Sequence, residues 1–138
     1  MKNYKILAEF VKDASVETKD IQTYLFVKDY ITKYQLTIDI TSHPTKNKLI
    51  EVNTIMKFED KENNEKKSYF ELVYVTIVKL DENVKEKKEI EKILLCEVQK
   101  DIQPKLESSF TNLIVNSGFN NIAVKNIDFD KLFNSRFN

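Results

Sequence analysis

Three stretches of the chain alternate apolar and polar residues, which is the pattern of half-buried β-strands. In the first, the even positions of Tyr4–Val16 are mostly apolar, and the alternation predicts that they share one face. Asp13 and Glu17 then project from the opposite, polar face together with Lys5 and Glu9. From the sequence alone, an ordinary solvated face is the favoured interpretation of these charges.

Two further alternating stretches, 34–40 and 50–58, are separated by a polar turn that contains Pro44. The segment from Glu59 to Lys67 holds nine residues, none of them apolar, so we expect a long hairpin loop there. The fourth strand, Tyr69–Leu80, is apolar on both faces. We expect its own helices to cover one face and another subunit to cover the other.

After a charged connector the apolar residues recur at every fourth position, which predicts a long helix beginning near Glu89. Pro104 removes an intrahelical hydrogen bond, so we expect a kink near residues 102–104. Gly118 supplies a left-handed residue that ends the helix. An extended piece, residues 119–126, then leads to Asp128, which is a suitable N-cap for a short C-terminal helix.

Residues 15–33 are ambiguous, because their apolar side chains fit either a helical stripe or the anchors of a crossover loop. We favour the loop. No repeat or linker divides the chain. The expected fold class is therefore α+β, with one domain over residues 1–138. It consists of a four-stranded antiparallel sheet followed by a long kinked helix and a short C-terminal helix.

The composition excludes several classes of function. With 22 Lys+Arg against 22 Asp+Glu the formal charge is zero, which argues against nucleic acid as a partner. One glycine cannot build a phosphate-binding loop, and one His with one Cys cannot build a multi-Cys/His zinc site. We expect no cofactor or metal. Cys96 is read as a buried inert thiol and His43 as a solvent-facing turn residue.

The cysteine usage suits a reducing cytoplasm, and no apolar run reaches the length of a membrane span or an export signal. The carboxylates on the predicted helix are interleaved with lysines as on solvated faces, so we expect no enzyme.

The aromatic residues are six Tyr and nine Phe. Most should fill the core, yet Tyr24, Phe26 and Tyr30 fall in the ambiguous segment and Phe119 follows the helix stop. Large rings at such positions can line a groove for an extended peptide. From the residues alone, core filling is the favoured interpretation, and the groove is the alternative.

Several stretches taken together resemble the bacterial protein-export chaperone family SecB. Tyr4–Glu17 (YKILAEFVKDASVE) resembles the first strand of the family, and Val27–Ile40 (VKDYITKYQLTIDI) its crossover and second strand. Glu71–Leu80 (ELVYVTIVKL) is similar to the fourth strand, and Ile127–Phe133 (IDFDKLF) to the closing helix. The similarity spans nearly the whole chain in the correct order.

This resemblance implies an ATP-independent cytosolic holdase that binds unfolded preproteins and delivers them to the SecA motor. It also implies a homotetramer assembled as a dimer of dimers. The implied sites are two sets, a client-binding set (Phe26, Tyr30, Phe119 and Ile122) and an acidic SecA-binding set (Asp13, Glu17, Tyr69 and Glu71). A holdase needs exposed apolar surface on a stable scaffold and several weak contacts that act together.

Two other functions compete with this one. The first is a SecB-like interaction module dedicated to one partner, such as an antitoxin. The second is a small α+β enzyme, which only scattered carboxylates would support and which we rank last. The sequence does not identify the clients, and it does not decide between dimer and tetramer.

Overall fold

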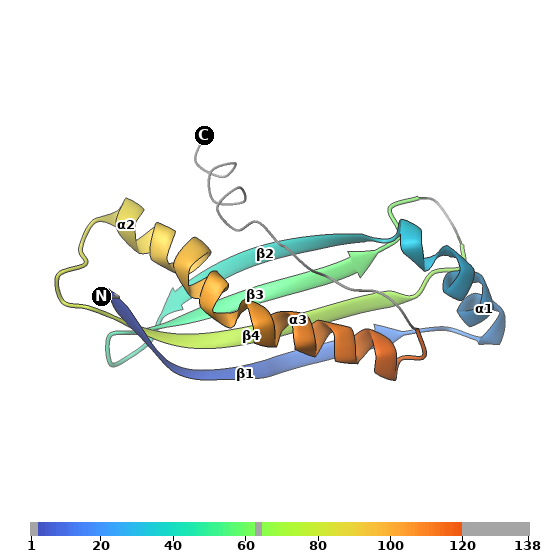
Figure 1. The fold of residues 1–138 in the computed structure, drawn as a ribbon, viewed down its shortest axis with the longest axis horizontal. Coiled ribbons are helices and arrows are strands. Elements are labelled where there is room, and N and C mark those ends of the chain that lie inside the picture. The colour runs from blue at the N-terminus through green and yellow to red at the C-terminus, as the bar shows by residue number, and fades with distance from the viewer. Residues whose placement is uncertain (1–2, 63–64, 120–138) are drawn as a thin grey trace.

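Four strands form one antiparallel sheet in the order β1-β4-β3-β2, which leaves β1 and β2 at the edges (Figure 1). The computed structural model describes residues 3–62 and 65–119. Its elements in chain order are β1 (Tyr4–Glu17), α1 (Ile21–Tyr30), the 3-10 turn η1 (Ile31–Lys33), β2 (Gln35–Pro44), β3 (Leu49–Glu59), β4 (Tyr69–Leu80), α2 (Lys87–Lys92), the π-helical turn η2 (Ile93–Glu97) and α3 (Val98–Asn116). The predicted sheet and its long hairpin loop are confirmed, whereas the predicted C-terminal helix lies outside the described residues.

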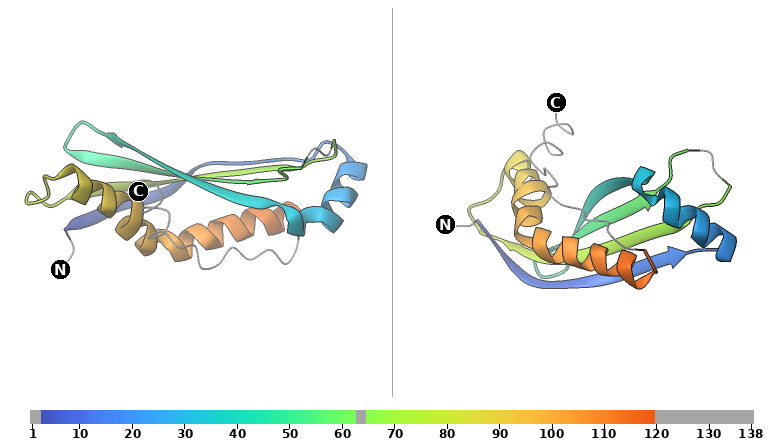
Figure 2. Two further views of the ribbon diagram at one scale, coloured as in Figure 1. Left: turned by 90° about the horizontal axis from the view of Figure 1, so that it is seen from above. Right: turned by 45° about the vertical axis from the view of Figure 1, so that its right-hand side comes forward.

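One long helix made of α2, η2 and α3 covers one face of the sheet, which Figure 2 shows as two layers. The core lies between these layers. Its fully buried side chains come from alternate positions of β3 and β4 and from one side of the helix, and they include Met56, Phe70, Leu72, Ile102, Leu106, Phe110 and Ile114. The opposite sheet face, called the outer face below, carries no helix of this chain among the described residues (Figure 2).

Strand β4 is apolar on both faces, as its sequence predicts. Phe70 and Leu72 are buried under the helix, whereas Val73, Val75 and Ile77 lie on the outer face. Val75 is buried there because the adjacent strands flank it with Phe10 and Asn53. The other two are only half-buried. The outer face therefore holds an apolar centre that the described chain leaves partly exposed.

Two β-bulges interrupt the alternation predicted for β1. The pairing with β4 shifts once between Ile6 and Ala8 and again between Val11 and Asp13. Each bulge adds one residue to β1 and so moves the following side chains to the other face. Between the bulges the faces are inverted: Phe10 lies opposite Val75 on the outer face, and Glu9 points toward the helix. The expectation that Glu9 shares a face with Lys5, Asp13 and Glu17 is therefore wrong.

The expectation of a loop at residues 15–33 is wrong. Strand β1 continues to Glu17, and Ile21–Tyr30 forms an α-helix. Its N-cap is Asp20, whose carboxylate accepts a hydrogen bond from the backbone N–H of Thr23 at 2.8 Å. Hydrogen bonds from Thr23 lower the pKa of Asp20. Val27 is fully buried and anchors this short helix to the core.

The irregularity in the long helix lies earlier than predicted. The π-helical turn occupies Ile93–Glu97, whereas Pro104 lies inside the α-helix Val98–Asn116. Because a π turn inserts one extra residue, it changes the direction of the helix without a proline. Gly118 has φ +96°, which confirms the predicted left-handed residue after the helix.

Buried polar contacts fix the helix over the sheet. Thr54 donates a hydrogen bond from its hydroxyl to the side-chain oxygen of Gln99 at 2.9 Å, and both residues are fully buried. Near β1, the Tyr74 hydroxyl donates to Glu9 at 2.9 Å, and Lys105 of α3 donates to the same carboxylate at 3.3 Å. Burial, and then the bond to Glu9, raise the pKa of Tyr74 to about 12.

Cys96 is buried, as predicted, in the π-helical turn. His43 faces solvent, but it lies in strand β2, where it pairs with Glu51, and not in a turn. The turn that follows begins beyond Pro44. Proline has no backbone N–H to donate, and an edge strand such as β2 tolerates it because one side of the strand is not paired.

Candidate functional site

Aromatic side chains gather at the end of the sheet where α1 lies. The rings of Phe26 and Tyr30, one helical turn apart, stack with centroids 5.3 Å apart. The Lys33 ammonium lies 5.3 Å from the centre of the Tyr30 ring, and the Tyr30 hydroxyl donates a hydrogen bond to Glu62. The two predicted contacts are thus brought together in a partly buried pair beside polar groups.

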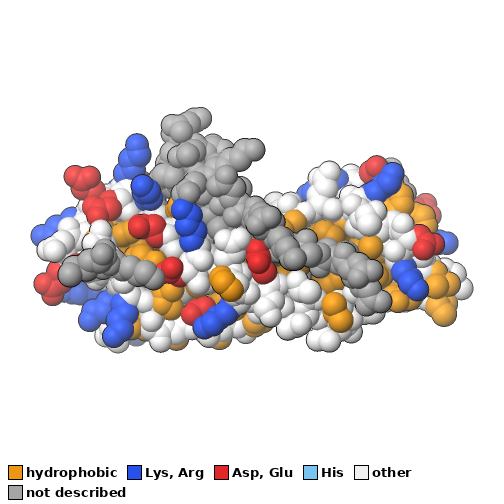
Figure 3. Space-filling view, in the orientation of Figure 1, with side chains coloured by type: hydrophobic (Ala, Val, Ile, Leu, Met, Phe, Trp, Pro, Cys, Tyr) orange, Lys and Arg blue, Asp and Glu red, His pale blue; other side chains and the backbone are white. Residues whose placement is uncertain are grey.

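The same helix exposes two aliphatic residues that sequence reasoning did not assign to a site. Ile21 is 66% exposed and Leu25 is 54% exposed, and they lie one turn apart on α1. Figure 3 shows hydrophobic side chains at this end of the molecule. The N-cap signal of Asp20 could have indicated this helix and its outward-facing pair. We call Ile21, Leu25, Phe26 and Tyr30 the α1 apolar surface.

Phe119, predicted as a groove residue, is only 1% exposed. Its ring lies 5.1 Å from that of Tyr24 and 5.5 Å from that of Phe70, so it joins α1 to the sheet. The Tyr24 hydroxyl also donates a hydrogen bond to the carbonyl of Gly118 at 2.6 Å. Phe119 therefore supports the α1 apolar surface from inside the core. Ile122 lies outside the described residues.

The four predicted acidic-set residues converge on the outer face near α1. In the β1–β4 pairing Asp13 lies opposite Val73 and Glu17 lies opposite Tyr69, while Glu71 lies between them along β4. Side chains that are directly opposite in antiparallel strands point to the same face. We call Asp13, Glu17, Tyr69 and Glu71 the acidic surface.

Tyr69 shows how close these groups are, because its pKa is raised by burial and then by Glu71, Glu59 and Asp13. Glu59, at the end of β3, was not predicted as a member of this cluster, and only the strand pairing brings it there. Lys57 partly neutralises the cluster, since its ammonium lies 3.9 Å from the Glu71 carboxylate. The remaining negative charge suits a basic partner segment.

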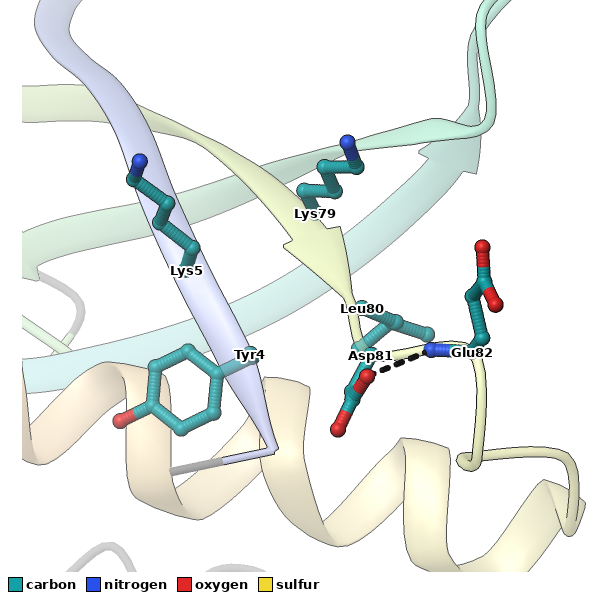
Figure 4. A pocket seen from close by; sticks show the side chains of 6 residues that line it. All are labelled: Tyr4, Lys5, Lys79, Leu80, Asp81 and Glu82. Carbon is teal, nitrogen blue, oxygen red and sulfur yellow. Dashed lines mark hydrogen bonds between the residues drawn. The ribbon is translucent and has the colours of Figure 1, made fainter. Parts of the chain in front are cut away.

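Lysines occupy the opposite end of the same two strands. Lys5 of β1 lies directly opposite Lys79 of β4, and both side chains point away from the helix (Figure 4). A cavity of about 350 Å³ lies at this end and is lined by Tyr4, Lys5, Lys79, Leu80, Asp81 and Glu82. Along β1 and β4, the outer face thus carries acidic groups at one end and basic groups at the other.

Comparison with known proteins identifies the family. Residues 1–138 match the family described as "Preprotein translocase subunit SecB". The chain belongs to the SecB family. It is 52% identical over 137 residues to a protein of Pelagibacter ubique (strain HTCC1062) named "Putative protein-export protein SecB". The aligned region covers 99% of this chain and 98% of the relative. The prediction of an export chaperone is confirmed at the level of the family.

A solved structure also shares the SecB fold. It is the Mycobacterium tuberculosis SecB-like chaperone in complex with a ChAD peptide from the HigA1 antitoxin, with a TM-score of 0.67 and 8% identity over 91% of this chain and 88% of that one. This similarity confirms the α+β fold class. Within residues 3–62 and 65–119, no helix combines the length and the apolar character needed to cross a bilayer.

Proposed function

We propose that this SecB protein holds unfolded preproteins in the cytoplasm and passes them to SecA, without catalysis or a cofactor. The observation that supports this proposal is the placement of two different surfaces at one end of the molecule. The α1 apolar surface is suited to apolar segments of an extended chain, and the acidic surface on the outer face is suited to a basic docking segment.

Client binding is assigned to Phe26 and Tyr30, with Ile21 and Leu25 as additional contacts on the same helix. Exposed aliphatic groups beside stacked rings accept varied side chains without a fixed sequence. Phe119 supports these contacts from beneath, and Ile122 stays a predicted contact. Each site is small, so useful affinity depends on several copies engaging one chain.

A tetramer would supply those copies. Strand β1 is a long edge with unpaired backbone groups, and Leu7, Phe10 and Val11 on it are each 45–48% exposed. Such an edge pairs readily with another chain. We therefore retain the dimer of dimers as part of the proposal, and the solution mass of the purified protein tests it.

Replacing both Phe26 and Tyr30 with alanine is expected to weaken binding of a permanently unfolded client about threefold to tenfold, because two partly exposed ring contacts are lost. Fluorescence anisotropy with a reduced and alkylated preprotein measures this change. Val115→Ala is the control, since Val115 is a 47% exposed apolar residue of α3 that belongs neither to the α1 apolar surface nor to the β1 edge. Equal effects of the control and the double variant would contradict the assignment.

Reversing two charges with Asp13→Lys and Glu71→Lys is expected to weaken SecA binding about tenfold and to leave client affinity unchanged. Surface plasmon resonance at low and physiological salt measures the first, and client anisotropy the second. Glu65→Lys with Glu86→Lys makes the same change in net charge at exposed positions outside the acidic surface. If this control weakens SecA binding as much, the assignment of the acidic surface is wrong.

The second candidate is a module dedicated to one partner such as an antitoxin, which the peptide in the related complex brings into consideration. Pull-downs from lysate with the wild-type chain separate the two. A broad set of unfolded preproteins supports the export chaperone, whereas a single retained partner supports the dedicated module.

A further inference from the structure

The loop between β3 and β4 lies beside α1, and hydrogen bonds fix it there (Figures 1 and 2). Its last residue, Ser68, is buried and forms two bonds with Tyr34. The Ser68 N–H donates to the tyrosine hydroxyl at 3.0 Å, and this hydroxyl donates to the Ser68 carbonyl at 3.2 Å. The hydroxyls of Ser68 and Thr18 also share a hydrogen bond at 2.7 Å. The end of the loop is therefore attached to the core.

The start of the loop is fixed as well. Asp60 follows directly after β3, is buried, and accepts a hydrogen bond from the backbone N–H of Glu62 at 2.9 Å. A bond from an aspartate side chain to the N–H two residues later is an Asx turn, which holds a loop backbone in one conformation. Asp60 also lies near Tyr34, since burial, and then the charge of Asp60, raise the pKa of that tyrosine. The backbone of Glu62 thus has a set position relative to the core.

The side chain of Glu62 connects this loop to the α1 apolar surface. Its carboxylate accepts the hydrogen bond of the Tyr30 hydroxyl, and a bond to a charged acceptor is stronger than a neutral one. Tyr30 is the last residue of α1, and its ring stacks on Phe26 with 19° between the ring planes. Both rings are only partly buried, and partly exposed side chains exchange between rotamers unless a contact holds them.

We propose that Glu62 is a positioning residue for the client site. Its carboxylate holds the Tyr30 ring, and through the stack the Phe26 ring, in the orientation that clients meet. The proposal rests on the assignment of client binding to Phe26 and Tyr30. Rings that are ordered before the client arrives lose less conformational freedom on binding, so the affinity is higher. Glu62 acts through Tyr30 and needs no contact with the client.

Direct attraction between the Glu62 carboxylate and basic client segments is the competing explanation. Such attraction depends on the charge alone, does not need the Tyr30 hydroxyl, and is screened by salt. Positioning depends on the hydroxyl and on an oxygen that accepts its hydrogen bond. Glu65 provides the matched control, because it is an exposed carboxylate of the same loop. The two explanations therefore predict different results for variants at these three residues.

The first experiment measures the affinity of full-length variants for a reduced and alkylated preprotein by fluorescence anisotropy. Glu62→Ala removes the acceptor and is expected to weaken binding about threefold, because the ring must then be ordered by the client. Glu62→Gln keeps a side-chain oxygen that accepts from the hydroxyl, so it should restore most of the affinity. Glu65→Ala should leave the affinity unchanged. Equal losses in the two alanine variants, or unchanged binding by Glu62→Ala, would overturn the proposal.

A double-mutant cycle tests whether Glu62 acts through the Tyr30 hydroxyl. Tyr30→Phe keeps the ring but removes the donor, so it should weaken binding by the same factor as Glu62→Ala, and combining the two should weaken binding no further. If Glu62→Ala weakens binding equally in the Tyr30→Phe protein, the carboxylate acts directly on clients and the positioning role is refuted. Urea unfolding accompanies each measurement. An affinity loss that equals the unfolded fraction would assign the effect to stability and also refute this role.

Failure of the positioning role is distinguishable from failure of the proposed function. If Phe26→Ala with Tyr30→Ala leaves client affinity unchanged, the assignment of the client site is itself wrong, whatever Glu62 does. If that double variant weakens client binding while Glu62→Ala does not, only the positioning role of Glu62 is wrong, and the client site stays as assigned.

Discussion

Phe119→Ala is expected to lower the free energy of unfolding by about 3–5 kcal/mol, the range for truncating a buried phenylalanine. The ring is 1% exposed and contacts both Tyr24 and Phe70, so its loss leaves a cavity where α1, the helix end and the sheet meet. Urea unfolding followed by circular dichroism measures the change. We expect client affinity to fall only to the extent that the substitution destabilises the packing of α1.

Val115→Ala is the matched control, because this apolar residue lies near the same end of α3 but is 47% exposed. We expect it to change the stability by less than about 0.5 kcal/mol. A Phe119→Ala protein with unchanged urea midpoint and weakened client binding would contradict the core assignment and return Phe119 to the client surface.

Gly118→Ala is expected to destabilise the protein by about 2–4 kcal/mol, from backbone strain together with crowding. The residue has φ +96°, and a Cβ there would lie 3.0 Å from Cε1 of Tyr24. The ring cannot move freely, because its hydroxyl donates to the Gly118 carbonyl. Thermal unfolding and urea titration measure the loss.

Two variants separate the causes at Gly118. Asn tolerates positive φ better than Ala but still carries the Cβ, so Gly118→Asn should destabilise less than Gly118→Ala yet more than zero. Tyr24→Phe removes the hydroxyl bond and leaves the backbone unstrained. If Gly118→Ala melts like the wild type, neither strain nor crowding operates at this position.

The fold was largely predictable because alternation and helical periodicity follow from burial on one or two faces. The sheet, the polar hairpin loop, the double apolar character of β4 and the left-handed Gly118 all follow from such patterns. Helix α1 does not follow from such a pattern, because its ten residues combine outward-facing Ile21 and Leu25 with buried Val27 and so form no single apolar face. The π-helical turn has no comparable sequence signal.

The candidate site was predictable only in part, and by resemblance more than by physics. The pairing of β1 with β4 brings together residues that are more than 50 positions apart in the chain, and no local pattern specifies that register. For the same reason Glu59 and Lys57 were missed. Phe119 was misplaced because a ring that follows a helix stop looks the same in sequence whether it faces solvent or the core.

The two bulges of β1 together determine which deletions this strand can tolerate. Each one reverses the inside and outside of everything beyond it, and two reversals cancel, so both ends of the strand keep the orientation of an uninterrupted ribbon. Loss of Leu7 or Lys12, the residues that the bulges add, would therefore leave the rest of β1 paired with β4 as before, with Asp13 and Glu17 still on the outer face. Single deletions in β1 should be tolerated at these two positions better than at the paired ones, where a shift of register turns side chains to the other face.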